Sequence, residues 1–288
     1  MKKKKILILG ASGLIGEELF YFFKTKGFNV IGTYRNNPKK NLFKLDINQK
    51  EINEEIFKKI SHIIICQNSF KKLDDYEINW KTSKKTDLIS LSLFLKKAKK
   101  NKIIPIFFSS DAVFDGLKGN YKESDKVKPV NKYGYLKVKM EDFIRKNFKK
   151  YMILRFSKIF SNDLKKREFM SDMIFNIENN NSATFAEDEY FSPLYLKDLK
   201  KYIYKLIKKE FVGTMHLSSV NKISRYRLAL KIKSFKKSKC KIIKTKINSL
   251  NLIAKRGKDC TLNTNKYDKQ FSIKKKTINF YLNNYEKK

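Results

Sequence analysis

Short runs of consecutive apolar residues alternate with segments of helical spacing along the first half of the chain. The apolar runs predict buried strands at residues 6–9, 29–33, 62–66, 103–109 and 152–156. The spacing between them predicts helices after residue 13, over residues 53–60, over the long tract 79–100 and before the last strand. Continuous apolar strands separated by helices are typical of a parallel sheet that is covered on both faces. The pattern therefore predicts an α/β fold built on a doubly wound parallel sheet.

The first apolar run follows MKKKK, and two interpretations compete for it. A cationic start before an apolar run is how a secretory signal begins. Here glycines interrupt the run, Glu17 and Glu18 follow them, and no small-residue cleavage site comes after. A helical spacing begins instead, and Gly27 stands where a left-handed residue caps a helix. The stretch therefore favours a strand, a glycine turn and a helix over a signal peptide.

The glycine turn directly after the first strand is a candidate phosphate site. At such a turn the backbone can approach a pyrophosphate closely, and the free amides at the helix start favour its negative charge. Glycines also serve tight turns in proteins that bind nothing, so the strand before and the helix after are what support the prediction. The turn is expected to bind a dinucleotide through Gly10, Ser12, Gly13, Leu14, Ile15 and Gly16.

The end of the second predicted strand indicates which dinucleotide this is. An acidic residue there would bind the adenosine ribose hydroxyls, whereas a cation accommodates a 2′-phosphate. Arg35, with Lys39 and Lys40 behind it, favours NADP(H), although a plain surface cation is the simpler alternative. Asp46, at the end of the third predicted strand, is expected to reach the adenine amino group or to begin a turn. NADPH is therefore the expected cofactor, with NADH as an alternative.

The second half of the chain has a looser pattern, without internal repeats or a clear linker. We expect residues 1–157 to form a Rossmann-type domain that binds the cofactor, with a return segment near residues 190–218. Residues 158–288 are expected to form mostly a smaller C-terminal lobe that binds the substrate. The lysine-rich segment 231–246 favours a solvated strand and loop over a binding arm.

The composition adds limits on partners and setting. A net charge of +38 favours polyanionic partners, but the basic residues are nearly all lysines spread along the whole chain. We therefore expect no specific binding of nucleic acid. No apolar stretch is long enough to span a bilayer. Three scattered cysteines, Cys66, Cys240 and Cys260, are too few for a disulfide framework, so we expect a cytoplasmic protein.

Two stretches contain the candidate catalytic residues. In IFFSSDAVFDG, Ser109 and Ser110 leave the carboxyl end of an apolar strand, where open α/β sheets bind ligands. In NKYGYLKVKMEDFI, Tyr133 and Lys137 lie four apart, which places both side chains on one face of a helix. A phenol with its ordinary pKa of about 10 is a poor acid until a cation lowers that pKa. Because this spacing arises by chance in any lysine-rich helix, the serine and the glycine turn are needed to support the assignment.

These motifs resemble those of the extended short-chain dehydrogenases/reductases, and within them the dTDP-4-dehydrorhamnose reductase group. That group shows an S-[ST]-D-x-V-F-D-G stretch, then Y-x-E-x-D, a proline and YGxxKxxxE. This chain reads SSDAVFDG and then has, in the same order and spacing, Tyr121, Glu123, Asp125, Pro129, Tyr133, Gly134, Lys137 and Glu141. The segments GASGLIG, ILRFSKIF, FSPLYLKDL, GTMHLSS and AKRGKDCTLNTNKY extend the resemblance over nearly the whole chain.

The resemblance implies hydride transfer to C4 of a 4-keto-6-deoxy sugar attached to a nucleoside diphosphate, as in dTDP-rhamnose and polysaccharide biosynthesis. It implies that Tyr133 protonates the nascent alkoxide, that Lys137 binds the nicotinamide ribose and keeps the phenol acidic, and that Ser110 hydrogen-bonds the ketone oxygen. The expected substrate contacts are Asp111, Val113 and Phe114. The expected cofactor contacts beyond the glycine turn are Arg35, Asp46, Ile47, Cys66, Gln67, Tyr133 and Lys137. A homodimer is possible. No metal is expected, because neither His62 nor His216 has a partner at ligand spacing.

The chain also departs from the group. Ala112 stands where the group usually has an aromatic residue, and Lys158 stands where tryptophan is common. Cys66, Gln67 and Asn68 follow the fourth strand, where the group tends to have small residues. The substrate pocket is therefore expected to differ from the group's pocket, while the Ser, Tyr and Lys set leaves the reaction type in place.

Two alternatives share the same fold. Some members of the wider family are non-catalytic, such as a regulatory subunit of methionine adenosyltransferase that acts as a binding module; an intact Ser110, Tyr133 and Lys137 set argues against this. The other alternative is a nucleotide-sugar epimerase or dehydratase, which usually retains tightly bound NAD(H).

Overall fold

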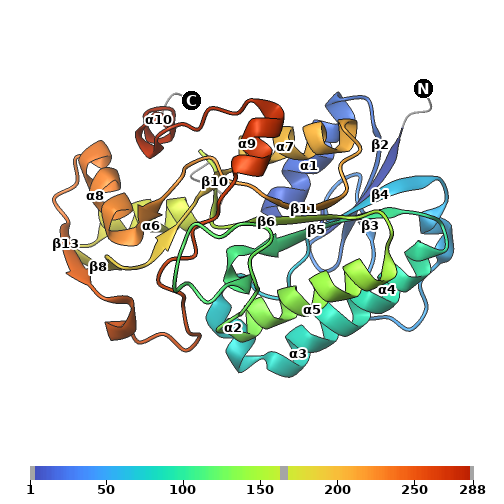
Figure 1. Ribbon diagram of the computed structural model, residues 1–288, viewed down its shortest axis with the longest axis horizontal. Helices are drawn as coiled ribbons and strands as arrows, with labels where there is room; N and C mark the ends of the chain where they lie inside the picture. The colour runs from blue at the N-terminus through green and yellow to red at the C-terminus, as the bar shows by residue number, and fades with distance from the viewer. Residues whose placement is uncertain (1–3, 163–167, 286–288) are drawn as a thin grey trace. The chain divides into compact units, whose positions relative to one another are not determined.

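The computed structural model describes residues 4–162 and 168–285, and its chain forms two compact units (Figure 1). The first unit comprises Met1–Ser109, Asn131–Leu154 and Lys200–Thr214. The second unit comprises Ser110–Val130, Arg155–Leu199 and Met215–Lys288. These bounds differ from the sequence-based ones, because residues 110–130 belong to the second unit and only residues 200–214 of the expected return segment belong to the first.

The first unit contains most of a seven-stranded sheet with the strand order β11-β6-β5-β4-β1-β2-β3. Its strands are β1 (Lys5–Leu9), β2 (Asn29–Tyr34), β3 (Phe43–Lys44), β4 (Ile60–Ile65), β5 (Ile104–Ser110), β6 (Met152–Phe156) and β11 (Gly213–His216). The pairs that join β3, β2, β1, β4 and β5 are parallel. The order reverses direction at β1, as in a doubly wound sheet, so the predicted fold class is confirmed.

Helices cover both faces of this sheet. They are α1 (Leu14–Thr25), α2 (Leu73–Ile78), α3 (Trp80–Lys84), α4 (Leu91–Lys99), α5 (Lys132–Asn147) and α7 (Leu196–Lys208), with a 3-10 turn η1 (Glu54–Phe57) and a π-helical segment η2 (Lys85–Ser90). Figure 1 shows α3, α4 and α5 on one face and α1 and α7 on the other. The central strands are buried on both sides for this reason, which is why they are continuous apolar runs in the sequence.

Side chains alternate between the two faces of each strand. Leu7 and Leu9 of β1 pack with Phe94 of α4 and Ile144 of α5 in one core cluster. Each of these four residues is almost fully buried. Burial of such side chains stabilises the fold by about 1.5–3 kcal/mol each, which fixes the helices that present the site residues.

Three local predictions for the first unit were inaccurate. The helix expected over residues 53–60 is only the 3-10 turn η1, and Lys59 with φ of +60° lies outside helical conformation. The tract expected to be helical over residues 79–100 begins earlier, at Leu73, and contains the π-helical η2. The strand expected to reach Asp46 ends at Lys44. Gly27, by contrast, has the left-handed φ of +77° that the sequence predicts after α1.

Over its described residues the second unit contains three two-stranded sheets and four complete helices. The sheets pair β7 (Ile159–Phe160) with β10 (Leu194–Tyr195), β9 (Tyr190–Phe191) with β12 (Ile223–Ser224), and β8 (Ser182–Ala186) with β13 (Lys241–Thr245). The helices are α6 (Phe169–Asn179), α8 (Arg225–Lys236), α9 (Asn265–Phe271) and α10 (Ile278–Asn283), with 3-10 turns η3 (Asp111–Val113) and η4 (Ile247–Ser249). Its own core gathers side chains of α6, α8 and α10.

The lysine-rich segment 231–246 was expected to be strand and loop, and half of that prediction was wrong. Residues up to Lys236 complete α8, because Leu228, Ala229 and Ile232 form a buried stripe on one side of this helix. The remainder is a loop over residues 237–240 and then β13, whose side chains are mostly exposed, so the expected loop and strand are present there.

Features that would indicate a membrane span or a metal centre are absent from the described part of the chain. Among residues 4–162 and 168–285, no helix is long and apolar enough to cross a bilayer. Over the same ranges, no three His, Cys, Asp or Glu side chains lie close enough together to bind a metal ion.

Candidate active site

The glycine turn joins β1 to α1 and has the geometry of a phosphate cradle. Gly10 has a φ of +78°, and Gly13 is the N-cap of α1 with no side chain to pair with the first amides of the helix. A Cβ on Gly16 would lie 2.2 Å from the Gly10 carbonyl oxygen, so this position has to be glycine for the turn to close. A Cβ on Gly13 would meet only the Gly10 oxygen, at 3.5 Å. Gly10 and Gly16 thus shape the turn, whereas Gly13 keeps the helix start open to an anion.

Gln67 lies against this turn. A Cβ on Gly10 would come within 3.1 Å of the Gln67 backbone nitrogen. The Gln67 Nε2 atom is buried and has no hydrogen-bond partner among the described residues. A buried amide donor without a partner is rare in folded proteins. The cradle and this donor fit a bound dinucleotide, and the residues present are therefore compatible with the cofactor expected from the sequence.

Several charged residues follow strands β2 and β3, at the predicted site of the adenosine ribose. Arg35 is exposed directly after β2, and Lys40 is exposed as well. Lys39 Nζ donates to Glu17 Oε1 over 2.6 Å, so this lysine is paired with α1. Asp46 Oδ1 accepts from the backbone nitrogen of Asn48 at 3.0 Å and from its side-chain amide at 2.9 Å. The carboxylate of Asp46 therefore begins a turn, which is one of the two expected roles. Arg35 and Lys40 are the exposed cations here, and Arg35 is the one directly after β2.

Cys66 follows β4, and its backbone nitrogen donates to the Leu9 carbonyl of β1 over 3.0 Å. Burial raises the pKa of its thiol well above the ordinary value. The thiol is therefore protonated at neutral pH, and Cys66 is not a nucleophile. Ile47, another expected cofactor contact, has a buried side chain.

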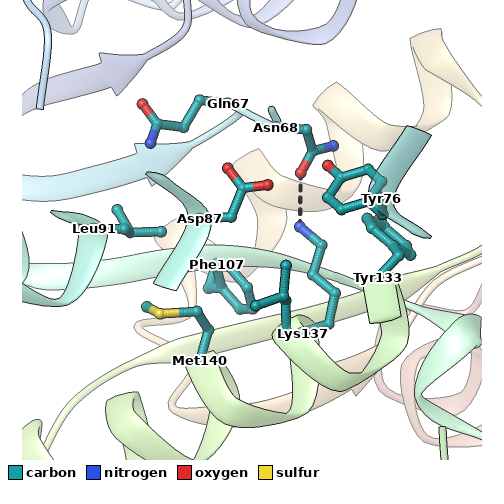
Figure 2. A pocket seen from close by; sticks show the side chains of 10 residues that line it. Gln67, Asn68, Tyr76, Asp87, Leu91, Phe107, Tyr133, Lys137 and Met140 are labelled. Atoms are coloured by element: carbon teal, nitrogen blue, oxygen red, sulfur yellow. Dashed lines mark hydrogen bonds between the residues drawn. The ribbon is translucent and has the colours of Figure 1, made fainter. Parts of the chain in front are cut away.

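Tyr133 and Lys137 line one pocket in the first unit (Figure 2). The other lining residues are Gln67, Asn68, Tyr76, Asp87, Leu91, Phe107, Leu136 and Met140. The Lys137 ammonium lies 5.3 Å from the centre of the Tyr133 ring. The Tyr133 ring in turn packs edge-on against Tyr76, with ring centres 4.9 Å apart. The structure thus brings together the two residues that the sequence placed on one helix face.

Lys137 is held in place by two acceptors. Its Nζ donates to Asn68 Oδ1 over 2.8 Å and to the Phe108 carbonyl of β5 over 3.0 Å. Only 7% of the residue is exposed. Burial lowers the pKa of Lys137 to about 8, and the carboxylates of Asp87 and Glu141 oppose that shift. At neutral pH the side chain is therefore a buried cation of fixed position beside the Tyr133 ring.

Glu141, the last residue of the YGxxKxxxE stretch, anchors α5 to β5. Its fully buried carboxylate accepts from Ser109 Oγ at 2.6 Å and from Arg145 at 2.7 Å. At the start of the helix, Asn131 Oδ1 accepts from the Gly134 backbone nitrogen at 2.8 Å. These contacts fix where α5 lies along the sheet, and with it the pair Tyr133 and Lys137.

Ser110 ends β5 and is the first residue of the second unit. Its hydroxyl donates to Asp111 Oδ1 over 2.9 Å and accepts from the Ala112 backbone nitrogen at 3.2 Å, so it caps η3. Burial raises the pKa of Asp111, and the Lys158 ammonium opposes that shift. The Ser110 hydroxyl is thus already engaged locally, and a substrate carbonyl would compete with Asp111 for its proton.

The expected substrate contacts Val113 and Phe114 have no exposed side-chain surface. Phe114 stacks on Tyr121 with ring centres 4.1 Å apart, and the Arg155 guanidinium lies 5.2 Å from the centre of the Phe114 ring. These side chains therefore pack inside the second unit. Their backbone groups are buried as well, and the Val113 carbonyl accepts from the Lys128 backbone nitrogen at 2.8 Å, so neither residue presents surface for a substrate contact in this structure.

The Y-x-E-x-D stretch belongs to the same buried network. Tyr121 donates its hydroxyl proton to Asp115, and its carbonyl accepts from Nδ1 of His216 at 3.0 Å. Glu123 Oε1 accepts from the His216 backbone nitrogen at 3.0 Å. The stretch and His216 are therefore structural elements of the second unit, and His216 is not a metal ligand.

Lys158 is the most marked change from the family pattern in the second unit. Burial, and after it the nearby Arg225 guanidinium, lower the pKa of Lys158. Glu189 pairs with Arg225. A cation replaces the usual large aromatic residue here, so the surroundings of Lys158 are more polar than the family pattern would make them.

Asn68, Asp87 and Tyr76 were not among the residues predicted for the site. Asn68 follows the carboxyl end of β4, which is the location where ligands bind in such sheets. Asp87 is the single acidic residue in the basic tract 79–100. Both signals are present in the sequence, but neither shows that these side chains lie beside Lys137.

Comparison with known proteins shows similarity both to dTDP-4-dehydrorhamnose reductases and to a subunit of methionine adenosyltransferase. The family model described as the RmlD substrate binding domain matches residues 4–286. A hypothetical dTDP-4-dehydrorhamnose reductase from Sulfolobus tokodaii is 28% identical, with a TM-score of 0.84 and coverage of 93% of this chain and 95% of that one. The dTDP-4-dehydrorhamnose reductase from Bacillus anthracis, solved in complex with NADP, is 23% identical, with a TM-score of 0.85 and 98% coverage of both chains. Methionine adenosyltransferase 2 subunit beta from Bos taurus is 24% identical over 238 residues, which are 80% of this chain and 71% of that protein. The chain belongs to the family of the RmlD substrate binding domain.

Proposed function

We propose that this protein is an NADPH-dependent reductase of a nucleotide-activated 4-keto-6-deoxy sugar, similar to dTDP-4-dehydrorhamnose reductase. The observation that supports this most strongly is the buried Lys137 ammonium beside the Tyr133 ring, in a pocket that Gln67 connects to the glycine turn. Family membership and the similarity to solved reductases also support a reductase function.

Tyr133 is the proposed proton donor. As a sugar carbonyl is reduced, negative charge develops on its oxygen, and a positioned acid that protonates this oxygen contributes about 10²–10⁴-fold to the rate. The Lys137 cation favours the ionised phenol, which makes Tyr133 a stronger acid at neutral pH. Bound NADPH supplies the hydride.

Ser110 is proposed to hydrogen-bond the ketone oxygen. Its hydroxyl would leave Asp111, its present partner, to do so. A donor aimed at developing charge stabilises the transition state more than the ground state. Asp111 is the proposed substrate contact in the second unit, and the buried Val113 and Phe114 would support the turn that carries it.

The proposed cofactor site uses the glycine turn, residues 10–16, for the pyrophosphate and Arg35 for the 2′-phosphate. Gln67 Nε2 would gain the partner that it lacks, and Lys137 would bind the nicotinamide ribose. The NADP complex of the Bacillus anthracis reductase supports NADPH, while NADH remains an alternative because other proteins of this fold, such as MoeE5, were solved with NAD. We propose that the enzyme works in the cytoplasm, as a monomer or homodimer, on precursors of polysaccharide.

The test is consumption of NADPH or NADH, followed by absorbance, with a panel of nucleoside-diphosphate 4-keto sugars. The wild-type protein should oxidise NADPH with at least one of them. The Tyr133→Phe variant should be about 10²–10⁴-fold slower. Equal rates for the two proteins would contradict the proposed mechanism.

A second candidate is a non-catalytic NADP-binding subunit. It is favoured by the similarity to methionine adenosyltransferase 2 subunit beta over most of the chain. A protein that binds NADPH tightly and reduces none of the sugars would fit this candidate. Retention of NAD(H) through purification would instead indicate an epimerase or dehydratase.

A further inference from the structure

The pocket around Lys137 contains one acidic residue, Asp87, and one basic residue, Lys137. In Figure 2 the Asp87 carboxylate, the Asn68 amide and the Lys137 ammonium point toward one another. Asp87 comes from η2, whereas Lys137 comes from α5. Two opposite charges from separate elements thus line the same pocket.

Asp87 also holds the loop that follows β4. Its Oδ2 accepts from the Ser69 backbone nitrogen at 3.0 Å, and its Oδ1 accepts from Ser69 Oγ at 2.8 Å. The two preceding residues of that loop are Gln67, which packs against Gly10, and Asn68, which binds Lys137. Asp87 therefore fastens the segment that links the glycine turn to the proposed catalytic lysine.

The backbone around Asp87 is π-helical. Helices widen into such turns rarely, and such turns are frequent at functional sites. Next to Asp87, Thr86 Oγ1 donates to Asn48 Oδ1 over 3.2 Å, which ties the wide turn to the loop after β3. The turn is therefore held from two sides, and its acidic residue has a fixed place.

We propose that Asp87 is a positioning residue, which keeps Lys137 in its charged form and fastens the loop of Gln67 and Asn68 beside it. The proposal deepens the reductase function, on which it rests for its catalytic meaning. The charge interaction itself does not require that function, and it is measured without cofactor or substrate.

The other charged and titratable groups near Lys137 do not replace Asp87. Glu141 acts in the same direction, but its carboxylate is already paired with Arg145 and accepts from Ser109. Tyr76 and Tyr133 face Lys137 as rings. Burial raises the pKa of Tyr76 strongly, so this phenol is neutral. Asp87 is thus the anion that opposes the cost of burying the Lys137 cation.

A double-mutant cycle on urea unfolding at pH 7 tests the charge interaction in the absence of cofactor. The four proteins are the wild type, Asp87→Asn, Lys137→Met and the combination of the two. Asp87→Asn should lower the unfolding midpoint in the wild type, and it should lower the midpoint clearly less when Lys137→Met is also present. Equal losses in both backgrounds would overturn the proposal.

The pH dependence of NADPH binding, followed by fluorescence, is the second readout. Lys137 has to be charged to bind best, so affinity should fall on the alkaline side, and Asp87→Asn should move that fall down by about one pH unit or more. Ser69→Ala loses one of the two loop contacts but keeps the Asp87 charge. Its NADPH affinity should therefore fall at the same alkaline pH as that of the wild type. Asp142→Asn neutralises an exposed acid on the same helix and should also match the wild type.

The possible outcomes separate cleanly. If Asp87→Asn loses NADPH affinity at the same alkaline pH as Ser69→Ala and Asp142→Asn do, Asp87 serves loop structure alone, and the proposal is overturned. If Asp87→Asn does not fold, Asp87→Ser replaces it in both measurements, because this variant also removes the charge and leaves room for water. Failure of both variants to fold would likewise overturn the proposal. A wild type that reduces no sugar contradicts the proposed function, while the unfolding cycle still decides the role of Asp87.

Discussion

The Lys137 ammonium lies 5.3 Å from the centre of the Tyr133 ring, one turn along the same helix. The arrangement does not depend on the helix alone, because Asn68 and the Phe108 carbonyl fix the position of the ammonium. Glu141 fixes the helix against β5. A pair that chance could place in any lysine-rich helix is here built into the core of the first unit.

Gly13→Ala and Gly16→Ala should separate cofactor binding from folding. An added Cβ at Gly16 would overlap the Gly10 carbonyl, so Gly16→Ala should destabilise the protein by about 1–3 kcal/mol and also weaken NADPH binding. Gly13→Ala meets no such obstacle, and it should leave stability nearly unchanged while weakening NADPH binding. Urea unfolding and a fluorescence titration measure the two effects. Loss of stability by Gly13→Ala with intact NADPH binding would contradict this account of the turn.

Arg35→Ala should change the choice of cofactor. Removal of a charge-assisted contact to the 2′-phosphate costs about 1.5–3 kcal/mol, which corresponds to roughly 10- to 100-fold in NADPH affinity. NADH lacks that phosphate, so its affinity should stay the same. Titration of both nucleotides against the variant measures the ratio. Lys40→Ala, an exposed cation nearby, is the control, and equal effects of the two substitutions would assign the preference to general surface charge.

The pH dependence of stability should report the buried lysine. The pKa of Lys137 is lowered to about 8 in the folded protein, compared with about 10.4 in an unfolded chain. Below pH 8 both states hold the proton, and the cost of burying the charge is fully present. Between pH 8 and 10.4 the unfolded state binds more protons, so the free energy of unfolding should rise, by up to about 3 kcal/mol.

The comparison with Lys137→Met isolates this contribution from that of the many other lysines. The difference in unfolding free energy between the wild type and Lys137→Met should change over pH 8 to 10.4 and should be constant between pH 6 and 7.5. A difference that is independent of pH over the whole range would show that Lys137 titrates normally.

Glu141→Gln should weaken the attachment of α5 to β5. The substitution keeps an oxygen for Ser109 but removes the charge that pairs with Arg145, so we expect a loss of about 1–3 kcal/mol in stability. The rate of the proposed reaction should fall as well, because Tyr133 and Lys137 lie on that helix. Asp142→Asn, which removes an exposed partner of the same Arg145, should have a much smaller effect on both.

The sequence predicted the parts of the fold that repeat simple physical patterns. Strands β1, β4, β5 and β6 were recognisable because they are buried on both faces, and the glycine turn because Gly10 needs a positive φ. The second half of α8 could not be told from a loop or strand by its lysines, since Leu228 and Ile232 become informative only once their buried face is known.

The candidate site was predicted as far as single motifs allow. Tyr133 and Lys137 share a helix, so their spacing was sufficient to bring them together. Asp87 lies fifty residues before Lys137 in the sequence, and only the packing of η2 beside α5 reveals their relationship. The buried state of Phe114 and the bond between Ser110 and Asp111 also depend on tertiary contacts, which is why the substrate side was predicted less well.

Transfer of deuterium from labelled NADPH to the sugar tests the central claim most directly. The wild type would be incubated with NADPH that carries deuterium at both hydrogen positions of nicotinamide C4 and with the 4-keto sugar nucleotide that supports the fastest turnover. The product would be analysed by mass spectrometry and NMR. We predict one deuterium at C4 of the product sugar, formed about 10²–10⁴-fold more slowly by Tyr133→Phe. Product without deuterium at C4, or equal rates of labelling by the two proteins, would contradict the claim that Tyr133 and Lys137 serve hydride transfer to this carbonyl.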